Sequence, residues 1–91
     1  MNLHEKVVIS QQAIAKEVGE ELVILDLTAG TYFGLDAVGT RIWQLMGESK
    51  SLAEICEVML DEYDVSRREL ERDIMILAEE LSTRNLISLT S

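Results

Sequence analysis

Side chains that could perform chemistry are few in this chain, and they are scattered. The single cysteine, Cys56, has no adjacent base, and the single histidine, His4, has no acid or nucleophile at motif spacing. One cysteine and one histidine cannot complete the usual four-ligand site of zinc. The five glycines match neither a phosphate-binding loop nor a nucleophile elbow. We therefore expect a protein that is not an enzyme and that uses no metal or cofactor, with Cys56 in the core.

Composition narrows the class of partner. Seventeen acidic residues against eight basic ones give a net charge of −9, which repels nucleic-acid phosphates. No apolar run approaches the ~18 residues of a membrane span, and the amino terminus lacks the apolar stretch of a secretory signal. We expect a cytoplasmic protein without a nucleic-acid or membrane partner. The length of 91 residues, without internal repeats, fits one domain over residues 1–91.

The first third of the chain reads as a sheet, over about residues 6–35. This region is rich in β-branched and aromatic residues, and glycine-bearing breaks divide it. The pattern predicts a β-meander with strands at about 13–18, 22–27 and 31–35, preceded by a short extended piece at 7–9.

The turn between the second and third of these strands suggests a register. Residues 28–30 suit a three-residue loop that ends in a left-handed Gly30. Leu27 would then face Thr31, and Tyr32 and Gly34 would lie on the face opposite to the core. On the core face the predicted pairs are Leu25 with Phe33 and Val23 with Leu35. For the hairpin at Gly19-Glu20 the pattern selects no register.

From Asp36 to about Arg84 the apolar spacing becomes helical. Asp36 can cap a first helix that Gly47 would end, and Ser51 and Ser66 each open a capping-box sequence. The tail 86–89 is apolar enough to return to the core as a short strand. Fold class is therefore predicted as α+β, a three-stranded antiparallel β-meander followed by three α-helices.

The meander order leaves residues 31–35 as an edge strand. The segment Thr31-Tyr32-Phe33-Gly34-Leu35 contains no charge and no proline, the features that commonly protect an edge. Such an edge favours binding of a peptide by strand addition, with backbone hydrogen bonds supplying affinity. The alternative is that the tail 86–89 or a second copy of the chain occupies this edge.

A third helix beside that edge would complete a groove, and either of its flanks could line it. One flank carries Arg67, Glu71, Met75 and Ala78, and the other carries Asp73, Ile76 and Glu80. Met75 is adaptable, Ala78 is small, and Arg67 could hold a peptide carboxylate. The candidate peptide-binding residues are Thr31, Tyr32, Phe33, Gly34, Leu35, Arg67, Glu71, Asp73, Ile74, Met75 and Ala78.

The second face of the sheet also needs a cover in this scheme. Leu22 and Ile24 would point away from the predicted core face, so both faces are partly apolar. We expect the piece at 7–9 to cover the second face. A partner protein or a dimer mate is the alternative.

Three segments carry a resemblance to a known family. Residues 21–27 (ELVILDL), 30–36 (GTYFGLD) and 38–43 (VGTRIW) resemble the PqqD-like family, and SLAEI at 51–55 and EYDV at 62–65 continue the likeness. Members of that family are recognition elements for ribosomally synthesised and post-translationally modified peptides (RiPPs). The resemblance implies a winged-helix-like fold and a leader peptide bound along the third strand, 31–35, and the third helix, 66–84.

The stand-alone length and the GTYFGLD segment look most like the discrete recognition proteins of lasso-peptide biosynthesis. The implied role is that of a peptide chaperone, with a leader peptidase and possibly an asparagine-synthetase-like cyclase as partners. Two other readings are a winged-helix transcription regulator that binds DNA and a homodimeric structural subunit. Sequence leaves open whether the chain is a monomer or a homodimer.

Overall fold

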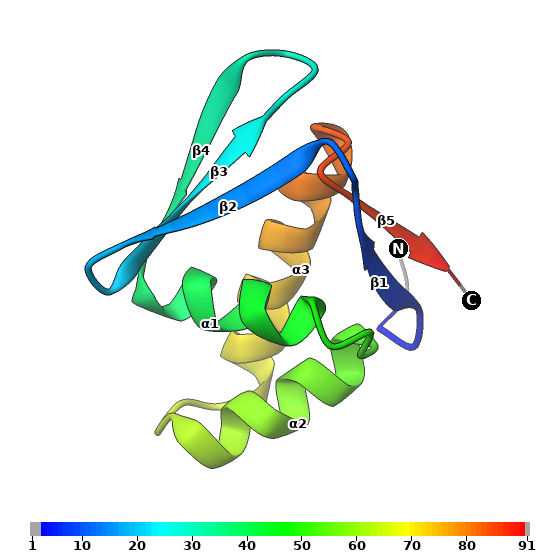
Figure 1. Ribbon diagram of the computed structural model, residues 1–91. Helices are drawn as coiled ribbons and strands as arrows, with labels where there is room; N and C mark the ends of the chain where they lie inside the picture. The colour runs from blue at the N-terminus through cyan, green and yellow to red at the C-terminus, as the bar shows by residue number, and fades with distance from the viewer. Residues whose placement is uncertain (1–2, 91) are drawn as a thin grey trace.

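The computed structural model describes residues 3–90, which form five strands and three helices (Figure 1). Sheet and helices follow each other as the sequence predicts, with a three-stranded meander first and three helices after it. This confirms the α+β, winged-helix-like fold class. The strands are β1 (Lys6–Ile9), β2 (Ala13–Val18), β3 (Glu21–Asp26), β4 (Thr31–Leu35) and β5 (Ile87–Thr90), and the helices are α1 (Ala37–Met46), α2 (Leu52–Glu62) and α3 (Arg67–Thr83).

The strands form two separate antiparallel sheets. One has the order β2-β3-β4, and the other joins β1 to β5, so the first and last strands lie side by side in Figure 1. The tail is a strand, as predicted. The expectation that residues 7–9 cover the second face of the meander is wrong, because Val7 pairs with Leu89 in the smaller sheet. That pairing satisfies the backbone groups of both terminal strands at once.

The predicted register of the β3–β4 hairpin is wrong by one residue. The loop has four residues, 27–30, and Leu27 is exposed within it. A one-residue slip exchanges the two faces of a strand, so Leu22 and Ile24 are buried while Val23 and Leu25 lie on the outer face. On β4 the prediction is confirmed, since Leu35 is buried and Tyr32 is 70% exposed. The observed pairs are Leu22 with Leu35, Ile24 with Phe33, and Asp26 with Thr31.

Asp26 explains the observed register. Its carboxylate is buried and accepts hydrogen bonds from Thr28 N at 3.0 Å, Ala29 N at 3.2 Å and Gln12 Nε2 at 3.1 Å. Its carbonyl oxygen accepts from Gly30 N at 2.8 Å, and Gly30 has a φ of +70°. Aspartate often organises a turn in this way by bonding to the backbone two residues on. The loop therefore begins directly after Asp26.

The β2–β3 hairpin, whose register the sequence left open, turns on two residues. Val18 pairs with Glu21, so Gly19 and Glu20 form the loop. Gly19 has a φ of +67°, a conformation that glycine adopts without a steric penalty. The outer face of the sheet therefore presents Ile14 and Val18 beside Val23, Leu25 and Tyr32, and both β2 residues are exposed.

Side-chain caps set where the helices begin. Asp36 Oδ1 accepts from Gly39 N at 2.8 Å, and Gly47 follows α1 as predicted. Ser51 forms the full capping box with Glu54. At Ser66 the structure shows one half of the box, in which Ser66 Oγ accepts from Glu69 N at 3.2 Å. These caps satisfy backbone donors that have no partner within a helix.

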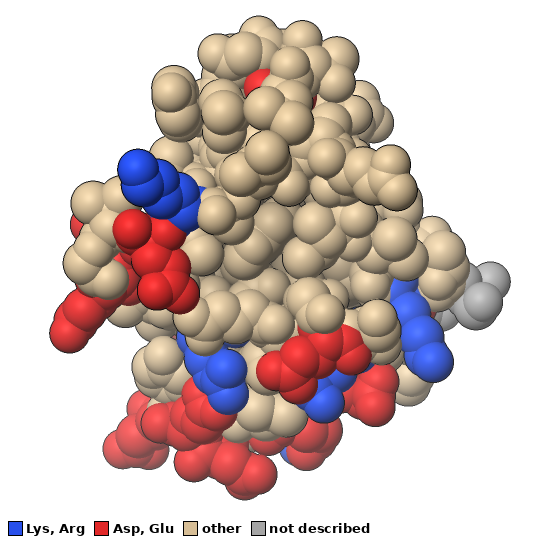
Figure 2. Space-filling view, in the orientation of Figure 1, with Lys and Arg blue, Asp and Glu red and all other residues tan. Residues whose placement is uncertain are grey.

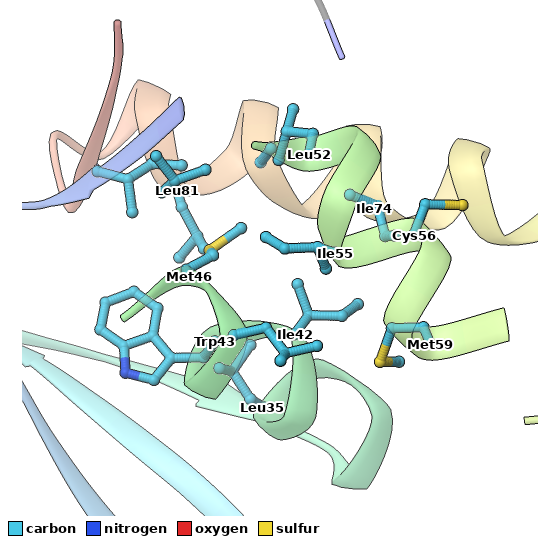
Figure 3. Packing of buried hydrophobic residues seen from close by; sticks show 14 of the residues in the cluster. Leu35, Ile42, Trp43, Met46, Leu52, Ile55, Cys56, Met59, Ile74 and Leu81 are labelled. Atoms are coloured by element: carbon cyan, nitrogen blue, oxygen red, sulfur yellow. The ribbon is translucent and has the colours of Figure 1, made fainter. Parts of the chain in front are cut away.

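The core lies where the three helices meet the inner face of β3 and the end of β4. Figure 3 shows Ile42 and Met46 of α1 and Ile55 of α2 pointing toward one another. Cys56 is buried in the same hydrophobic cluster, as predicted, and lies beside Ile74 in Figure 3. Helix α1 packs against β3 and β4, while α2 packs against α3. The sheet is therefore fixed to the helical half mainly through α1.

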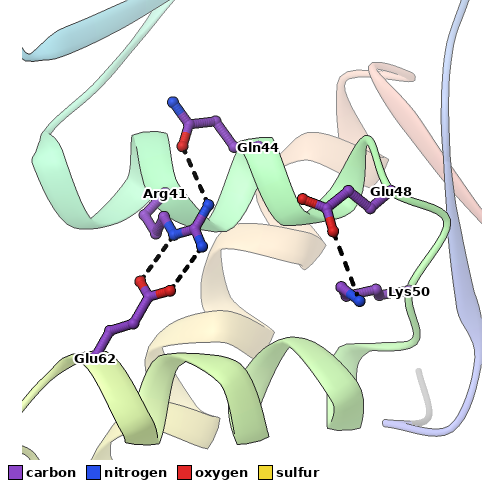
Figure 4. A network of polar contacts seen from close by, with 5 residues as sticks. All are labelled: Arg41, Gln44, Glu48, Lys50 and Glu62. Atoms are coloured by element: carbon purple, nitrogen blue, oxygen red, sulfur yellow. Dashed lines mark hydrogen bonds and ion pairs between the residues drawn. The ribbon is translucent and has the colours of Figure 1, made fainter.

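A polar contact on the surface holds α1 against α2. The Arg41 guanidinium donates to both carboxylate oxygens of Glu62, at 2.8 and 2.6 Å, and to Gln44 at 3.4 Å (Figure 4). This hydrogen bonding lowers the pKa of the Glu62 carboxyl below its ordinary value. Lys50 and Glu48 pair at 3.6 Å in the following loop. Among residues 3–90, no helix is both long and apolar enough to cross a membrane.

Replacing Asp26 tests its role in the turn. Asp26→Ala removes the acceptor for three hydrogen bonds, so we expect a loss of about 1–3 kcal/mol in the free energy of unfolding. Asp26→Asn keeps the accepting Oδ1 and should retain most of the stability. Urea unfolding followed by circular dichroism measures both. Equal stability of the alanine variant and the parent would contradict this role.

Candidate functional site

Strand β4 has one open edge. It pairs with β3 on one side, and no strand within residues 3–90 pairs with it on the other. The tail does not occupy that edge, because β5 pairs with β1. An edge strand presents unpaired N–H and C=O groups, which form a template for another strand. The chain therefore leaves open the edge that the sequence singles out.

Beside this edge the surface is hollowed into a groove of about 380 Å³, which we call the β4–α3 groove. Its walls come from the second half of β4 and from one flank of α3, and the start of α1 forms its floor. The lining is apolar at the floor and acidic at the rim. The lining residues are Phe33, Gly34, Leu35, Asp36, Val38, Gly39, Ile42, Asp73, Leu77 and Glu80.

The junction between β4 and α1 gives the groove its floor. Because Asp36 caps α1, the helix begins directly after the strand and runs beneath the strand's end. Gly39 lets the two elements approach closely. A Cβ atom at this position would lie 3.2 Å from Leu35 Cδ2 and 3.3 Å from Asp36 Oδ1. Gly34 differs, because a Cβ there would meet no heavy atom within 4 Å.

The structure brings four of the candidate residues together at the groove, namely Phe33, Gly34, Leu35 and Asp73. Thr31 and Tyr32 are exposed on the same strand but do not line it. The remaining candidates lie elsewhere on α3. Ile74 and Ala78 are in the core, Met75 is partly buried against it, Arg67 pairs with Glu57 of α2, and Glu71 is half-buried.

Helix α3 therefore faces the groove with the flank of Asp73, Leu77 and Glu80. The opposite flank turns toward α2, where the hydrogen bond from Arg67 lowers the pKa of the Glu57 carboxyl. The sequence candidates omitted Leu77, Val38 and Ile42. The helix cap at Asp36 could have indicated Val38 and Ile42, because a cap there places the first turns of α1 directly at the end of the edge strand.

Charge is unevenly distributed around the groove. Asp36, Asp73 and Glu80 are exposed at its rim. Arg84 lies outside the lining, one helical turn after Glu80, with its guanidinium carbon 4.8 Å from the centroid of the Phe33 ring. On the face drawn in Figure 2, charged side chains gather over the helical half and at the β2–β3 hairpin on the left, and the upper part of the sheet is largely uncharged.

The described lining of the groove contains no cysteine, histidine, serine or lysine. Burial raises the pKa of the Cys56 thiol, which disfavours the reactive thiolate. Cys56 is also not one of the groove-lining residues. Within residues 3–90 no cluster of three or more histidine, cysteine, aspartate or glutamate side chains could hold a metal ion. The arrangement of an open edge beside an apolar groove suits peptide binding.

A strand edge paired with a helix-lined groove defines a class of small peptide-binding domains, and comparison with known proteins identifies the family. The model of the family described as coenzyme PQQ synthesis protein D (PqqD) matches residues 21–87. That range contains β3, β4 and all three helices, and hence the whole groove. The chain therefore belongs to the PqqD family. No curated protein matches it significantly.

Two solved structures are similar to the chain over nearly its whole length. One is TbiB1 in complex with the TbiA(beta) leader peptide, with 41% identity, a TM-score of 0.83, and coverage of 88% of this chain and 93% of that one. The other is lasso peptide synthetase B1 complexed with the leader peptide, with 24% identity and a TM-score of 0.82. It covers 90% of this chain and 96% of its own, and it supports the fold.

The two glycines of the groove provide a matched test of its construction. Gly39→Val adds a side chain whose Cβ would crowd Leu35, so we expect a loss of about 1–3 kcal/mol in the free energy of unfolding. Gly34→Val adds them in open space on a strand and should change stability by less than about 0.5 kcal/mol, or raise it slightly. Urea titrations of both variants decide the matter. Similar losses at the two positions would show that Gly39 is not required for close packing.

Proposed function

We propose that this protein binds the leader segment of a ribosomally synthesised precursor peptide and presents it to processing enzymes. The leader would add to the sheet as an antiparallel strand beside β4, with side chains entering the β4–α3 groove. The observation that carries the proposal is the open edge of β4, which runs directly along the groove. The similar protein TbiB1, at 41% identity, was solved with a leader peptide bound.

Two kinds of contact would contribute to the affinity and selectivity of binding. Backbone hydrogen bonds to β4 would hold any peptide of suitable length, at a net gain of about 0.5–1.5 kcal/mol each. Apolar side chains that reach Val38, Ile42 and Leu77 would supply selectivity, because only alternate residues of an extended strand point to one side. The buried side chain of Leu35 fixes the end of β4 to the core, so the protein would lose little conformational entropy on binding.

Binding by this mode explains how a protein without catalytic groups could assist a reaction. A leader held on the domain brings the attached core peptide to an enzyme at a high effective concentration. A leader peptidase, and possibly an asparagine-synthetase-like cyclase of lasso-peptide biosynthesis, are the partners we propose. The protein would meet them in the cytoplasm, where precursor peptides are made. Candidate contact residues are those of β4, Thr31 to Leu35, with Asp73, Leu77 and Glu80 of α3.

The surface gives the DNA-binding alternative no support. A protein that binds DNA needs a basic surface, whereas the chain carries a net charge of −9 and three carboxylates border the groove.

A dimer that closes the β4 edge with a second copy would compete directly with the leader. Measurement of the mass in solution, with and without peptide, separates these two occupants of the edge.

Titration of isotope-labelled protein with the TbiA(beta) leader peptide tests the proposal. We expect amide shifts at residues 31–35 and at Asp73, Leu77 and Glu80, because these residues border the proposed strand. Amides of β1 and β5 serve as the internal control and should stay unchanged, since they form the other sheet. Shifts confined to β1, β5 and α2 would contradict binding at the β4 edge.

A further inference from the structure

The charges around the β4–α3 groove differ from one end of β4 to the other. Three carboxylates, those of Asp36, Asp73 and Glu80, border its lining. Asp36 is engaged in capping α1 through Gly39 N. Asp73 and Glu80 are exposed, and neither forms an ion pair with any residue in the range 3–90. Glu80 lies one helical turn before Arg84, and both border the same surface depression, so the negative part of the rim is centred on Asp36 and Asp73.

The charge changes sign along the strand. Leu35 and Asp36, at the carboxyl end of β4, share the groove with Asp73. Two residues back along the same strand, Phe33 lies under the Arg84 guanidinium at 4.8 Å. Helix α3 runs from Arg67 to Thr83, so its Asp73 end borders the end of β4 and its Arg84 end borders the middle of β4.

Because the charge differs along β4, its effect on a bound peptide depends on the direction in which the peptide chain runs. A strand that pairs antiparallel with β4 has its amino-terminal part beside Leu35 and Asp36, and its carboxyl-terminal part beside Thr31. Its amino-terminal part would then lie among carboxylates. A cationic side chain there gains attraction chiefly from Asp36 and Asp73, while the same side chain farther along would pass Glu80 and approach Arg84.

We propose that the groove selects leader segments in which a lysine or arginine precedes the apolar residue that enters the groove between Val38 and Leu77. This inference rests on the proposed function and specifies the class of peptide that the site accepts. Exposed ion pairs are individually weak, so each correctly placed cation should raise affinity roughly two- to fivefold. Rim charges also act on association rate, and the preference should fade as salt rises.

The chain offers a matched pair of variants to separate the groove from the overall negative charge. Asp73→Asn with Glu80→Gln removes the two unpaired carboxylates of the rim. Glu17→Gln with Asp61→Asn makes the same change of net charge on β2 and α2, away from the groove lining. All four positions are exposed, so both double variants should fold.

Selection from a displayed library of fully randomised 12-residue peptides is the experiment, run at low salt on the parent and both double variants. The parent and the Glu17/Asp61 variant should enrich peptides with a basic residue on the amino-terminal side of an apolar one. The Asp73/Glu80 variant should enrich the apolar residue without the basic one. For a selected peptide, replacing that basic residue with glutamine should lower affinity roughly two- to fivefold on the parent and leave it unchanged on the Asp73/Glu80 variant.

The outcomes distinguish this inference from the proposed function. Enriched peptides that shift residues 31–35 but carry no positional preference for basic residues would overturn the charge selection alone. The same conclusion follows if the preference survives in the Asp73/Glu80 variant. If no peptide is enriched and the TbiA(beta) leader also fails to bind, leader recognition itself is overturned.

Discussion

The register of the β3–β4 hairpin is the constraint on which the rest of the structure depends. Asp26 is buried and gathers three donors around its carboxylate, so the loop begins at the next residue. With that start, Leu22 and Ile24 face the helices, and Leu35 reaches the core at the end of β4. A slip of one residue would turn Val23 and Leu25 inward instead. The position of α1 follows from the same pairing, because Asp36 caps the helix immediately after Leu35.

Much of this architecture could be predicted from local chemistry. Caps at Asp36 and Ser51 mark helix starts, and Gly47 marks a helix end, because each satisfies or ends a run of backbone hydrogen bonds. The register could not be predicted from apolar alternation, since both faces of β3 carry β-branched or leucine residues. Alternation treats Asp26 as a surface residue, whereas the turn buries it as a hydrogen-bond acceptor.

At the candidate site, likewise, one part could be predicted from local sequence and the other depends on tertiary packing. The exposed edge strand follows from the strand order and from the absence of charge and proline in residues 31–35. The flank of α3 that faces the edge depends on how α3 packs against α2, and no local spacing encodes that packing. Arg67 illustrates this, because its pairing with Glu57 directs it toward α2 and leaves Asp73 and Glu80 at the groove.

In the proposed binding mode, the open edge of β4 and the β4–α3 groove have different roles. We propose that backbone groups of the strand supply affinity for any extended peptide, and that the groove walls restrict which peptides bind. Neither the edge nor the groove requires the protein to change its fold, since Leu35 and Ile42 already anchor both in the core. The outer face of the sheet, with Ile14, Val18 and Tyr32 exposed, stays clear of this groove.

Intermolecular nuclear Overhauser effects between a bound leader and β4 test the central claim most directly. With labelled protein and unlabelled TbiA(beta) leader peptide, an antiparallel strand beside β4 should give contacts between peptide α-protons and α-protons of alternate residues within 31–35. The contacts should run in opposite order along the two chains. A bound peptide whose α-protons contact only α2, or only β1 and β5, would contradict the account.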